Sequence, residues 1–192
     1  MAAVLELGQP GPAGGEVLDL GCGTGWLLES LARKGVEPRR LHGVEALAVR
    51  AEAASRRVPG AQVLTADARE LPYESDRFEL VTLVTVLSSM PGEDAVAAAL
   101  REARRVASPA GLVLCYEPRL PTPLNRRTRR ISRRELERSL GPAVAQRSLT
   151  GLPPLARRLG RATPRLYPPL SRIAPTHRLT VHAGAAAPRR RG

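Results

Sequence analysis

The sequence predicts an α/β fold in three layers, with an open, doubly wound and mostly parallel sheet between two layers of helices. Short apolar segments of strand length alternate with longer segments of helical periodicity over the first two-thirds of the chain. Strands and helices that alternate in this way form parallel sheets, because right-handed crossovers place helices on both faces. The 192 residues, 43% hydrophobic and 25% charged, suffice for one globular domain with its own core.

Five apolar segments are expected to form the parallel part of the sheet, and three helices connect them. Polar residues, glycine or proline bound each segment. The predicted strands are Glu16–Leu20, Arg40–Glu45, Ala61–Ala66, Phe78–Val84 and Gly111–Glu117. The predicted helices are Gly25–Lys34, which ends at Gly35, the alanine-rich Leu47–Arg57, and Glu93–Val106.

The last third is less regular, yet we expect it to complete the same domain, residues 1–183. Ser132–Leu140 is predicted as a helix, because Ser132 and Glu135 have the spacing of a capping box. Two strands, 143–149 and 176–183, are expected to close the sheet. Between them, residues 151–175 form a proline-rich, basic and amphipathic insertion, interpreted as a substrate lid. Residues 184–192 are predicted to be a disordered basic tail.

A glycine-rich turn follows the first predicted strand. The strand reaches Asp19 within VLDLGCGTG (residues 17–25), and Gly21, Gly23 and Gly25 lead into the next helix. Glycine is needed where φ is positive or where a ligand contacts bare backbone, and the amides that open the helix favour negative charge. A dinucleotide fingerprint needs a third glycine where this chain has Trp26. The spacing therefore suits an adenosine that carries an amino acid, although a plain tight turn remains an alternative.

Two further acidic residues are predicted at the same edge of the sheet. Glu45 closes the second strand, where a carboxylate can accept hydrogen bonds from ribose hydroxyls. Asp67 closes the third strand and can accept a hydrogen bond from adenine, with the backbone N–H of Ala68 beside it. Each acid alone could be an exposed carboxylate at a strand end. Together with the glycine turn, they predict one adenosyl ligand at the carboxyl edge.

These motifs in this order resemble those of the class I methyltransferases that use S-adenosylmethionine (SAM). The resemblance covers residues 16–119 and rests on VLDLGCGTGWLLESLARKG, GVE, TADARELPYESDRFELVTLVTVLSSMPGE and LREARRVASPAGLVLCYEPR. It implies a Rossmann-like sheet of seven strands in the order 3-2-1-4-5-7-6, with the last strand antiparallel. It also implies seven cofactor-binding residues. They are Asp19 at the end of the first strand, Gly21 and Gly23 at the methionine part of SAM, Glu45 at the ribose, Asp67 and Ala68 at the adenine, and Val84 beneath the ligand.

The remaining sequence is similar, more loosely, to a bacterial subgroup of this family whose members mostly have no assigned substrate. The similar segments are EPRLPTPLNRRTRRIS, GLPPLARRLG and APTHRLTV. One departure concerns the N-terminus. The family has one or two helices before the first strand, whereas fewer than sixteen residues precede it here.

The resemblance implies methyl transfer, but no residue is assigned as catalytic and no metal site is predicted. Transfer from a sulfonium needs mainly alignment of acceptor, methyl and sulfur, and a general base only where the acceptor must lose a proton. Candidates at the active edge are Ser88, Ser89, Tyr116, Glu117 and His177. A salt bridge with Arg119 is an equally good interpretation of Glu117, and a surface or packing role is the better one for His177.

The charge distribution leaves the acceptor open. Residues 119–192 carry 18 basic and only 2 acidic side chains, which favours an anionic partner. A small-molecule acceptor is the leading hypothesis. RNA is an alternative, although a single Phe and 3% aromatic residues argue against base stacking, and a non-catalytic SAM-binding protein is another. No segment has the apolar length of a membrane span or the pattern of a secretory signal, so a cytoplasmic location is expected.

Overall fold

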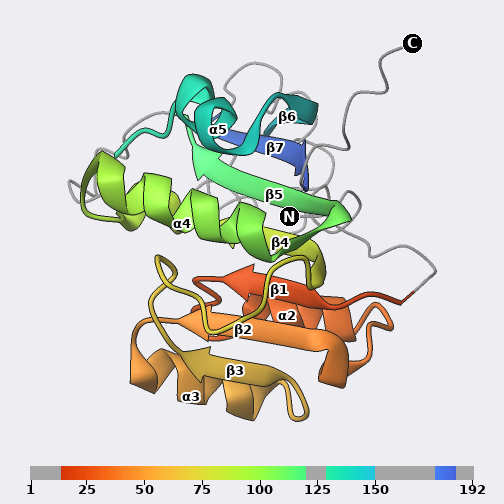
Figure 1. Cartoon of the computed structure of the whole chain (residues 1–192). Coiled ribbons are helices and arrows are strands. Elements are labelled where there is room, and N and C mark those ends of the chain that lie inside the picture. The colour runs from red at the N-terminus through yellow and green to blue at the C-terminus, as the bar shows by residue number, and fades with distance from the viewer. Residues whose placement is uncertain (1–13, 120–128, 150–175, 185–192) are drawn as a thin grey trace, which may run out of the picture.

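The computed structural model describes residues 14–119, 129–149 and 176–184, which form a seven-stranded sheet with helices on both faces (Figure 1). The strands are β1 (Val17–Leu20), β2 (Leu41–Glu45), β3 (Gln62–Thr65), β4 (Phe78–Val84), β5 (Ala107–Pro118), β6 (Ala143–Leu149) and β7 (His177–Ala183). Their order is β3-β2-β1-β4-β5-β7-β6. Strands β1 to β5 pair in parallel, and β7 is antiparallel to both of its neighbours.

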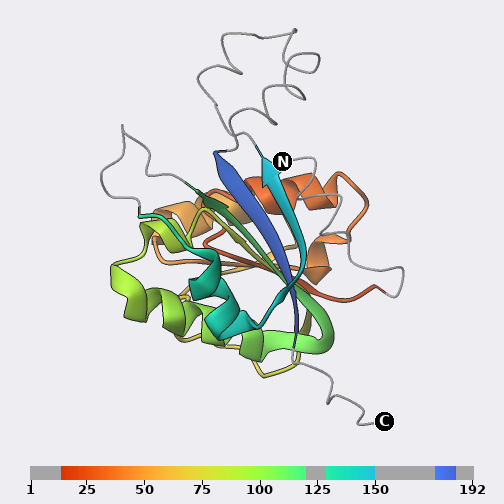
Figure 2. The ribbon, with the colours of Figure 1, turned by 90° about the horizontal axis from the view of Figure 1, so that it is seen from above.

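Four helices cover the two faces of the sheet. They are α2 (Trp26–Ala32), α3 (Ala48–Arg57), α4 (Gly92–Val106) and α5 (Arg133–Leu140), and two short 3-10 helices are η1 (Pro38–Arg40) and η2 (Leu87–Ser89). Helices α4 and α5 lie on one face of the sheet and α2 and α3 on the other, as the view from above in Figure 2 shows. The predicted three-layer α/β fold is therefore confirmed, as are the strand order and the antiparallel last strand.

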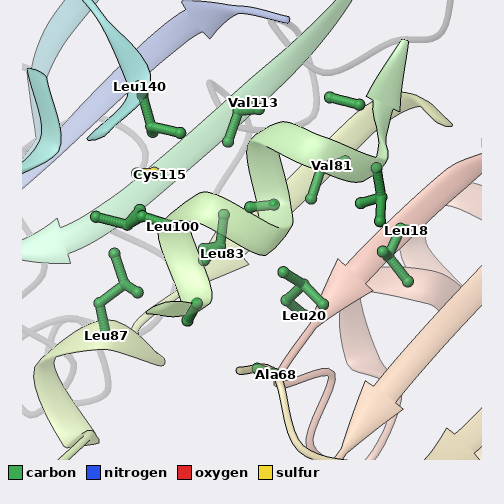
Figure 3. Close-up of a cluster of buried hydrophobic side chains, with 14 of the residues drawn as sticks. Leu18, Leu20, Ala68, Val81, Leu83, Leu87, Leu100, Val113, Cys115 and Leu140 are labelled. Carbon is green, nitrogen blue, oxygen red and sulfur yellow. The ribbon is translucent and has the colours of Figure 1, made fainter. Parts of the chain in front are cut away.

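Two hydrophobic clusters hold the layers together. One joins α4 and α5 to the sheet, and Figure 3 shows Leu18, Leu83, Leu100 and Leu140 within it. The other joins α2 and α3 to the opposite face through leucines of α2, which lie on one side of that helix as its spacing predicts. Both clusters are close to fully buried. The packed layers fix the positions of the loops at the carboxyl ends of the parallel strands.

The boundaries differ from the predicted ones in two informative places. β5 begins at Ala107, directly after α4, because Ala107 pairs with Phe78 before a register shift brings Leu112 opposite Leu80. β3 ends at Thr65, so Asp67 lies in the following loop rather than at the end of the strand. The capping box of α5 is present, since Ser132 accepts from Glu135 N while the Glu135 side chain accepts from the N-cap backbone.

The predicted lid 151–175, the tail from residue 185 onward and residues 1–13 lie outside the described residues. Within the described ranges, no helix has the length and apolar character that a bilayer crossing requires.

Candidate functional site

A pocket of about 490 Å³ opens at the carboxyl edge of the sheet, beside β1, β2 and β4. This volume lies in the range of small-molecule sites, roughly 300–1,000 Å³. Six of the seven residues predicted from the sequence line it, namely Gly21, Gly23, Glu45, Asp67, Ala68 and Val84. Three consecutive strand-end loops thus face one cavity, which is the arrangement that a single adenosyl ligand requires.

The glycine turn is fixed to β2 by its backbone. The amides of Gly21 and Cys22 both donate to the carbonyl oxygen of Val44, at 2.7 and 3.1 Å. Gly21 and Gly23 have φ of 69° and 56°, a region that residues with a side chain adopt at a cost. A Cβ at Gly21 would lie 2.4 Å from Cγ2 of Val86, whereas a Cβ at Gly23 would meet no atom within 4 Å. Gly21 therefore permits close packing of two loops, and Gly23 presents bare backbone to the cavity.

Glu45 is buried and joins two loops of the site. Its Oε2 accepts from Gly23 N at 3.0 Å, and its Oε1 accepts from Leu47 N at 3.1 Å. The residue is only 7% exposed, but it lines the pocket. A carboxylate oxygen can accept more than one hydrogen bond, so each oxygen keeps capacity for a hydroxyl of a ligand. The two backbone contacts hold the carboxylate in a fixed orientation for that purpose.

Asp67 is exposed and engaged by its neighbour Arg69. The Arg69 backbone N donates to Oδ1 at 2.8 Å, and its guanidinium donates to both carboxylate oxygens, with Nη2 to Oδ2 at 2.6 Å. These hydrogen bonds lower the pKa of Asp67 below its ordinary value. The carboxylate therefore stays ionised, and Arg69, which also lines the pocket, lies over it.

Asp19 lies behind the pocket rather than in its lining. It is 3% exposed and accepts a hydrogen bond from Oγ1 of Thr82 at 2.7 Å, across the β1–β4 pair. Burial, opposed by the Thr82 hydrogen bond and reinforced by the nearby Glu45 carboxylate, raises the pKa of Asp19 from 3.8 to about 7. Its position between the two strands supports the glycine turn from below.

The loop after β4 forms the other side of the pocket, and the sequence interpretation largely missed it. Thr85, Val86, Ser89 and Met90 line the cavity there, and Arg50 of α3 lines the opposite side. Thr85 has a positive φ of 57°. Its backbone N–H donates a hydrogen bond to the Tyr116 carbonyl at 2.8 Å, which helps to hold this conformation. Only Ser89 was among the candidates. The sequence gives only a weak signal for such loop residues, because the direction of their side chains depends on how the loop turns after the strand.

The other candidates for a base do not line the pocket. The His177 ring stacks on Tyr116 with centroids 4.9 Å apart, which agrees with the packing interpretation of His177. Glu117 is 2% exposed, and among the described residues it forms no salt bridge with Arg119, the interpretation that the sequence left open beside a catalytic role. Instead, its carboxylate accepts from the amides of Leu87 and Ser88, at 2.8 and 3.2 Å. Glu117 thereby anchors η2, the segment beside the pocket.

Glutamine at position 117 should remove part of the pH dependence of stability. Burial raises the pKa of Glu117 from 4.5 to about 7, against the opposing hydrogen bonds from η2. Between these values the folded protein holds a proton that the unfolded chain releases. The free energy of unfolding therefore falls as the pH rises through this window, by on the order of 3 kcal/mol for this group. Because Glu117→Gln cannot ionise, we expect its free energy of unfolding to lack this fall with pH. Its amide nitrogen cannot accept from Leu87 N or Ser88 N as a carboxylate oxygen does, so we expect it to be less stable than the wild type below the window and to lose that disadvantage as the pH rises.

Urea unfolding measured from about pH 4 to about pH 8 checks this expectation. Glu70→Gln, an exposed residue, serves as the control. The raised pKa of Asp19 also makes the free energy of unfolding fall with pH, and it does so in the wild type and in both variants. Parallel pH profiles for Glu117→Gln and the wild type would contradict the raised pKa.

The fold and the pocket together define a nucleoside-binding α/β protein. Residues 17–111 match the family model described as the methyltransferase domain. A demethylmenaquinone methyltransferase of Staphylococcus saprophyticus is 30% identical over 113 residues, which are 57% of this chain and 47% of the relative. A malonyl-[acyl-carrier protein] O-methyltransferase of Halorhodospira halophila is 37% identical over 101 residues, or 51% and 33% of the two chains. The chain thus spans less than half the length of these curated relatives.

Solved structures show the same fold at low identity. Geranyl diphosphate C-methyltransferase from Streptomyces coelicolor A3(2), in complex with Mg²⁺, geranyl diphosphate and S-adenosyl-L-homocysteine (SAH), aligns with a TM-score of 0.73 and 16% identity. The alignment covers 96% of this chain and 76% of that one. The [4+2]-cyclase SpnF aligns with a TM-score of 0.66 and 19% identity, over 91% and 76% of the two chains. This chain belongs to the class I SAM-dependent methyltransferases, and SAM is the cofactor of this family.

Proposed function

We propose that this protein transfers a methyl group from SAM to a small-molecule acceptor. The observation that carries the proposal is the shared pocket: three strand-end loops supply Gly23, Glu45 and Asp67 to one cavity. That set combines bare backbone for an amino-acid part with two separate carboxylates for a ribose and an adenine. A dinucleotide would instead need a pyrophosphate site at the glycine turn, where Trp26 follows Gly25.

The proposed binding roles are those that the family resemblance implies, and the pocket lining supports them. Gly21 and Gly23 contact the methionine part, and Glu45 accepts from the ribose hydroxyls with its orientation fixed by Gly23 N and Leu47 N. Asp67 and Ala68 bind the adenine edge, and Val84 supports the ligand from the end of β4. Asp19 acts from behind, through its bond to Thr82, and does not contact the ligand directly.

When bound, SAM supplies a methyl group on a positively charged sulfur. The residues of this chain need only to hold the acceptor in line with that group, and such positioning lowers a barrier by about 7–11 kcal/mol. Thr85, Val86, Ser89 and Met90 line the part of the pocket opposite Arg50 and are available to position the acceptor. No described residue of this lining is a carboxylate or histidine beyond Glu45 and Asp67.

A small-molecule acceptor is supported by the relatives and by the size of the site. One structural neighbour holds geranyl diphosphate beside SAH. Fold likeness alone does not decide the reaction, because SpnF shares the fold and is a cyclase. The experiment must therefore detect the transferred methyl group itself.

Titration calorimetry with SAM, SAH and NAD is the first test, and we expect SAM and SAH to bind with one-to-one stoichiometry. The second test incubates the protein with SAM that carries a radiolabelled methyl group and a cell extract separated into small-molecule, RNA and protein fractions. Label in the small-molecule fraction supports the proposal. Label only in RNA, binding of NAD in place of SAM, or binding without any labelled product would each contradict it.

A further inference from the structure

The face of β7 beneath α5 carries polar side chains where the rest of that layer is apolar. Arg178, Thr180 and His182 alternate along β7, opposite Glu117, Cys115 and Val113 of β5. Cys115 and Val113 belong to the hydrophobic cluster that packs against α4 and α5. Arg178 Nε, Thr180 Oγ1 and His182 Nε2 are buried and have no hydrogen-bond partner among the described residues. Unpaired buried polar atoms are costly. Thr180 and His182 are fully buried, so of the three only Arg178, which is half-buried, can reach a polar ligand.

Four arginines, here called the arginine cluster (Arg119, Arg130, Arg133 and Arg178), meet at the end of this face. Arg119 follows β5, and its Nη1 donates to Oγ of Ser148 at 3.1 Å. Ser148 pairs directly with Arg178 across β6 and β7, which places both side chains on one face of the sheet. Arg133 begins α5, which packs over the same face, and Arg130 lies three residues before it.

The charges of the arginine cluster are mostly uncompensated. Within the described part of the chain, only Arg133 of the four forms an ion pair, with Glu137 at 2.7 Å. Burial, followed by the positive charges of Arg119, Arg130 and Arg133 and opposed by Glu137, lowers the pKa of Arg178 below its ordinary value. Like charges on one face of the sheet repel one another, and an anion bound beside them would reduce the repulsion.

The arginine cluster adjoins the proposed acceptor side of the pocket. The backbone N–H of Arg129 donates to the carbonyl of Ser88 at 2.9 Å, so the segment that carries Arg130 runs along η2. Ser89, the next residue of η2, lines the pocket. Glu117, which pairs with Arg178 in the sheet, holds η2 from the other side through the amides of Leu87 and Ser88.

We propose that the arginine cluster binds the anionic group, a phosphate or a carboxylate, of the methyl acceptor. The inference rests on the function proposed above and names the chemical class of its substrate. Planar guanidinium groups bind both anions through paired, charge-assisted hydrogen bonds. The cofactor keeps its own site, because the residues predicted to bind it lie on the other side of η2, around β1, β2 and the loop after β3.

Titration of inorganic phosphate into the protein tests the site directly, with sodium chloride of equal ionic strength as the baseline. Arg119→Gln/Arg130→Gln should bind phosphate about tenfold more weakly than the wild type, since it loses charge-assisted hydrogen bonds. The matched control is Arg39→Gln/Arg56→Gln, which removes the same charge from side chains that are 80% and 71% exposed. Equal weakening in both double variants would mean that only net charge matters, and would overturn the proposal.

Saturating SAH separates this site from the cofactor pocket, where Arg50 and Arg69 could also attract phosphate. We expect the phosphate affinity of the wild type to be the same with and without SAH. Competition between the two would place the anion in the cofactor pocket and overturn the proposal. Arg178→Gln, which leaves the exposed arginines in place, should also weaken phosphate binding while SAH binding stays unchanged.

The labelled small-molecule product gives an independent readout. It should be retained on an anion exchanger, and the apparent KM for the fraction that contains the acceptor should rise in Arg119→Gln/Arg130→Gln without a change in SAH affinity. A labelled product that passes through the exchanger would overturn the proposal. Absence of SAH binding by the wild type would instead overturn the proposed function, so the two failures are distinguishable.

Discussion

Alanine at position 45 should weaken SAM binding by roughly two to four orders of magnitude. Two hydrogen bonds from ribose hydroxyls to a carboxylate contribute about 1.5–3 kcal/mol each, and about 1.4 kcal/mol is tenfold in affinity. Glu45→Ala removes both acceptors. It also frees the amides of Gly23 and Leu47, which the carboxylate holds at 3.0 and 3.1 Å, so the glycine turn loses its link to the loop after β2. Calorimetry with SAH measures the loss of affinity, since SAH is the product of methyl transfer and has no methyl group left to react.

A ribose-modified ligand separates the direct from the indirect part of this effect. An SAH analogue that lacks the 2′-hydroxyl should bind the wild type more weakly than SAH does, but should bind Glu45→Ala about as well as SAH. Glu52→Ala, on the exposed side of α3, serves as the matched control and should leave both affinities unchanged. If Glu45→Ala stays folded and binds SAH like the control, the predicted ribose contact is wrong.

The order of elements could be predicted because it depends on local pattern. Apolar runs of strand length and helices with a 3.6-residue period identify the alternating units, and parallel strands bring their carboxyl ends to one edge. Gly21, Gly23 and Glu45 line the pocket at that edge, while their contacts with a ligand stay a prediction. The close approach of Gly21 to Val86 was not predictable, because the 64 residues between them must fold before the two meet.

The environment of single charges was harder to predict than their position. For Glu117 the sequence left two interpretations open, a salt bridge with an arginine such as Arg119 and a catalytic role. In the structure, the chain turns after Pro118, so Arg119 contacts Ser148 while Glu117 is covered by η2. Asp19 was grouped with the binding residues by its place before the glycines. The inward direction of its side chain, toward Thr82, depends on the pleat at the end of a strand only four residues long.

Gly21→Ala and Gly23→Ala should differ in their effects. Gly21→Ala should mainly lower the stability of the fold, and Gly23→Ala should mainly weaken ligand binding. Both positions have positive φ, so both substitutions carry a backbone cost of about 1–2 kcal/mol. Only the Cβ at Gly21 collides with Val86, at 2.4 Å, and overpacking of this kind adds about 1–3 kcal/mol. We expect Gly21→Ala to lower the free energy of unfolding by about 2–5 kcal/mol in total.

Gly23→Ala should lower that free energy only by its backbone cost, because its Cβ meets no atom of the protein within 4 Å. The same methyl group stands where Gly23 lines the pocket, so it should reduce SAH affinity by more than its effect on stability suggests. Urea unfolding and SAH calorimetry on both variants give the comparison, with each variant as the control for the other. Equal destabilisation, together with unchanged SAH binding in Gly23→Ala, would mean that the turn is only a tight turn and that no ligand contacts its backbone.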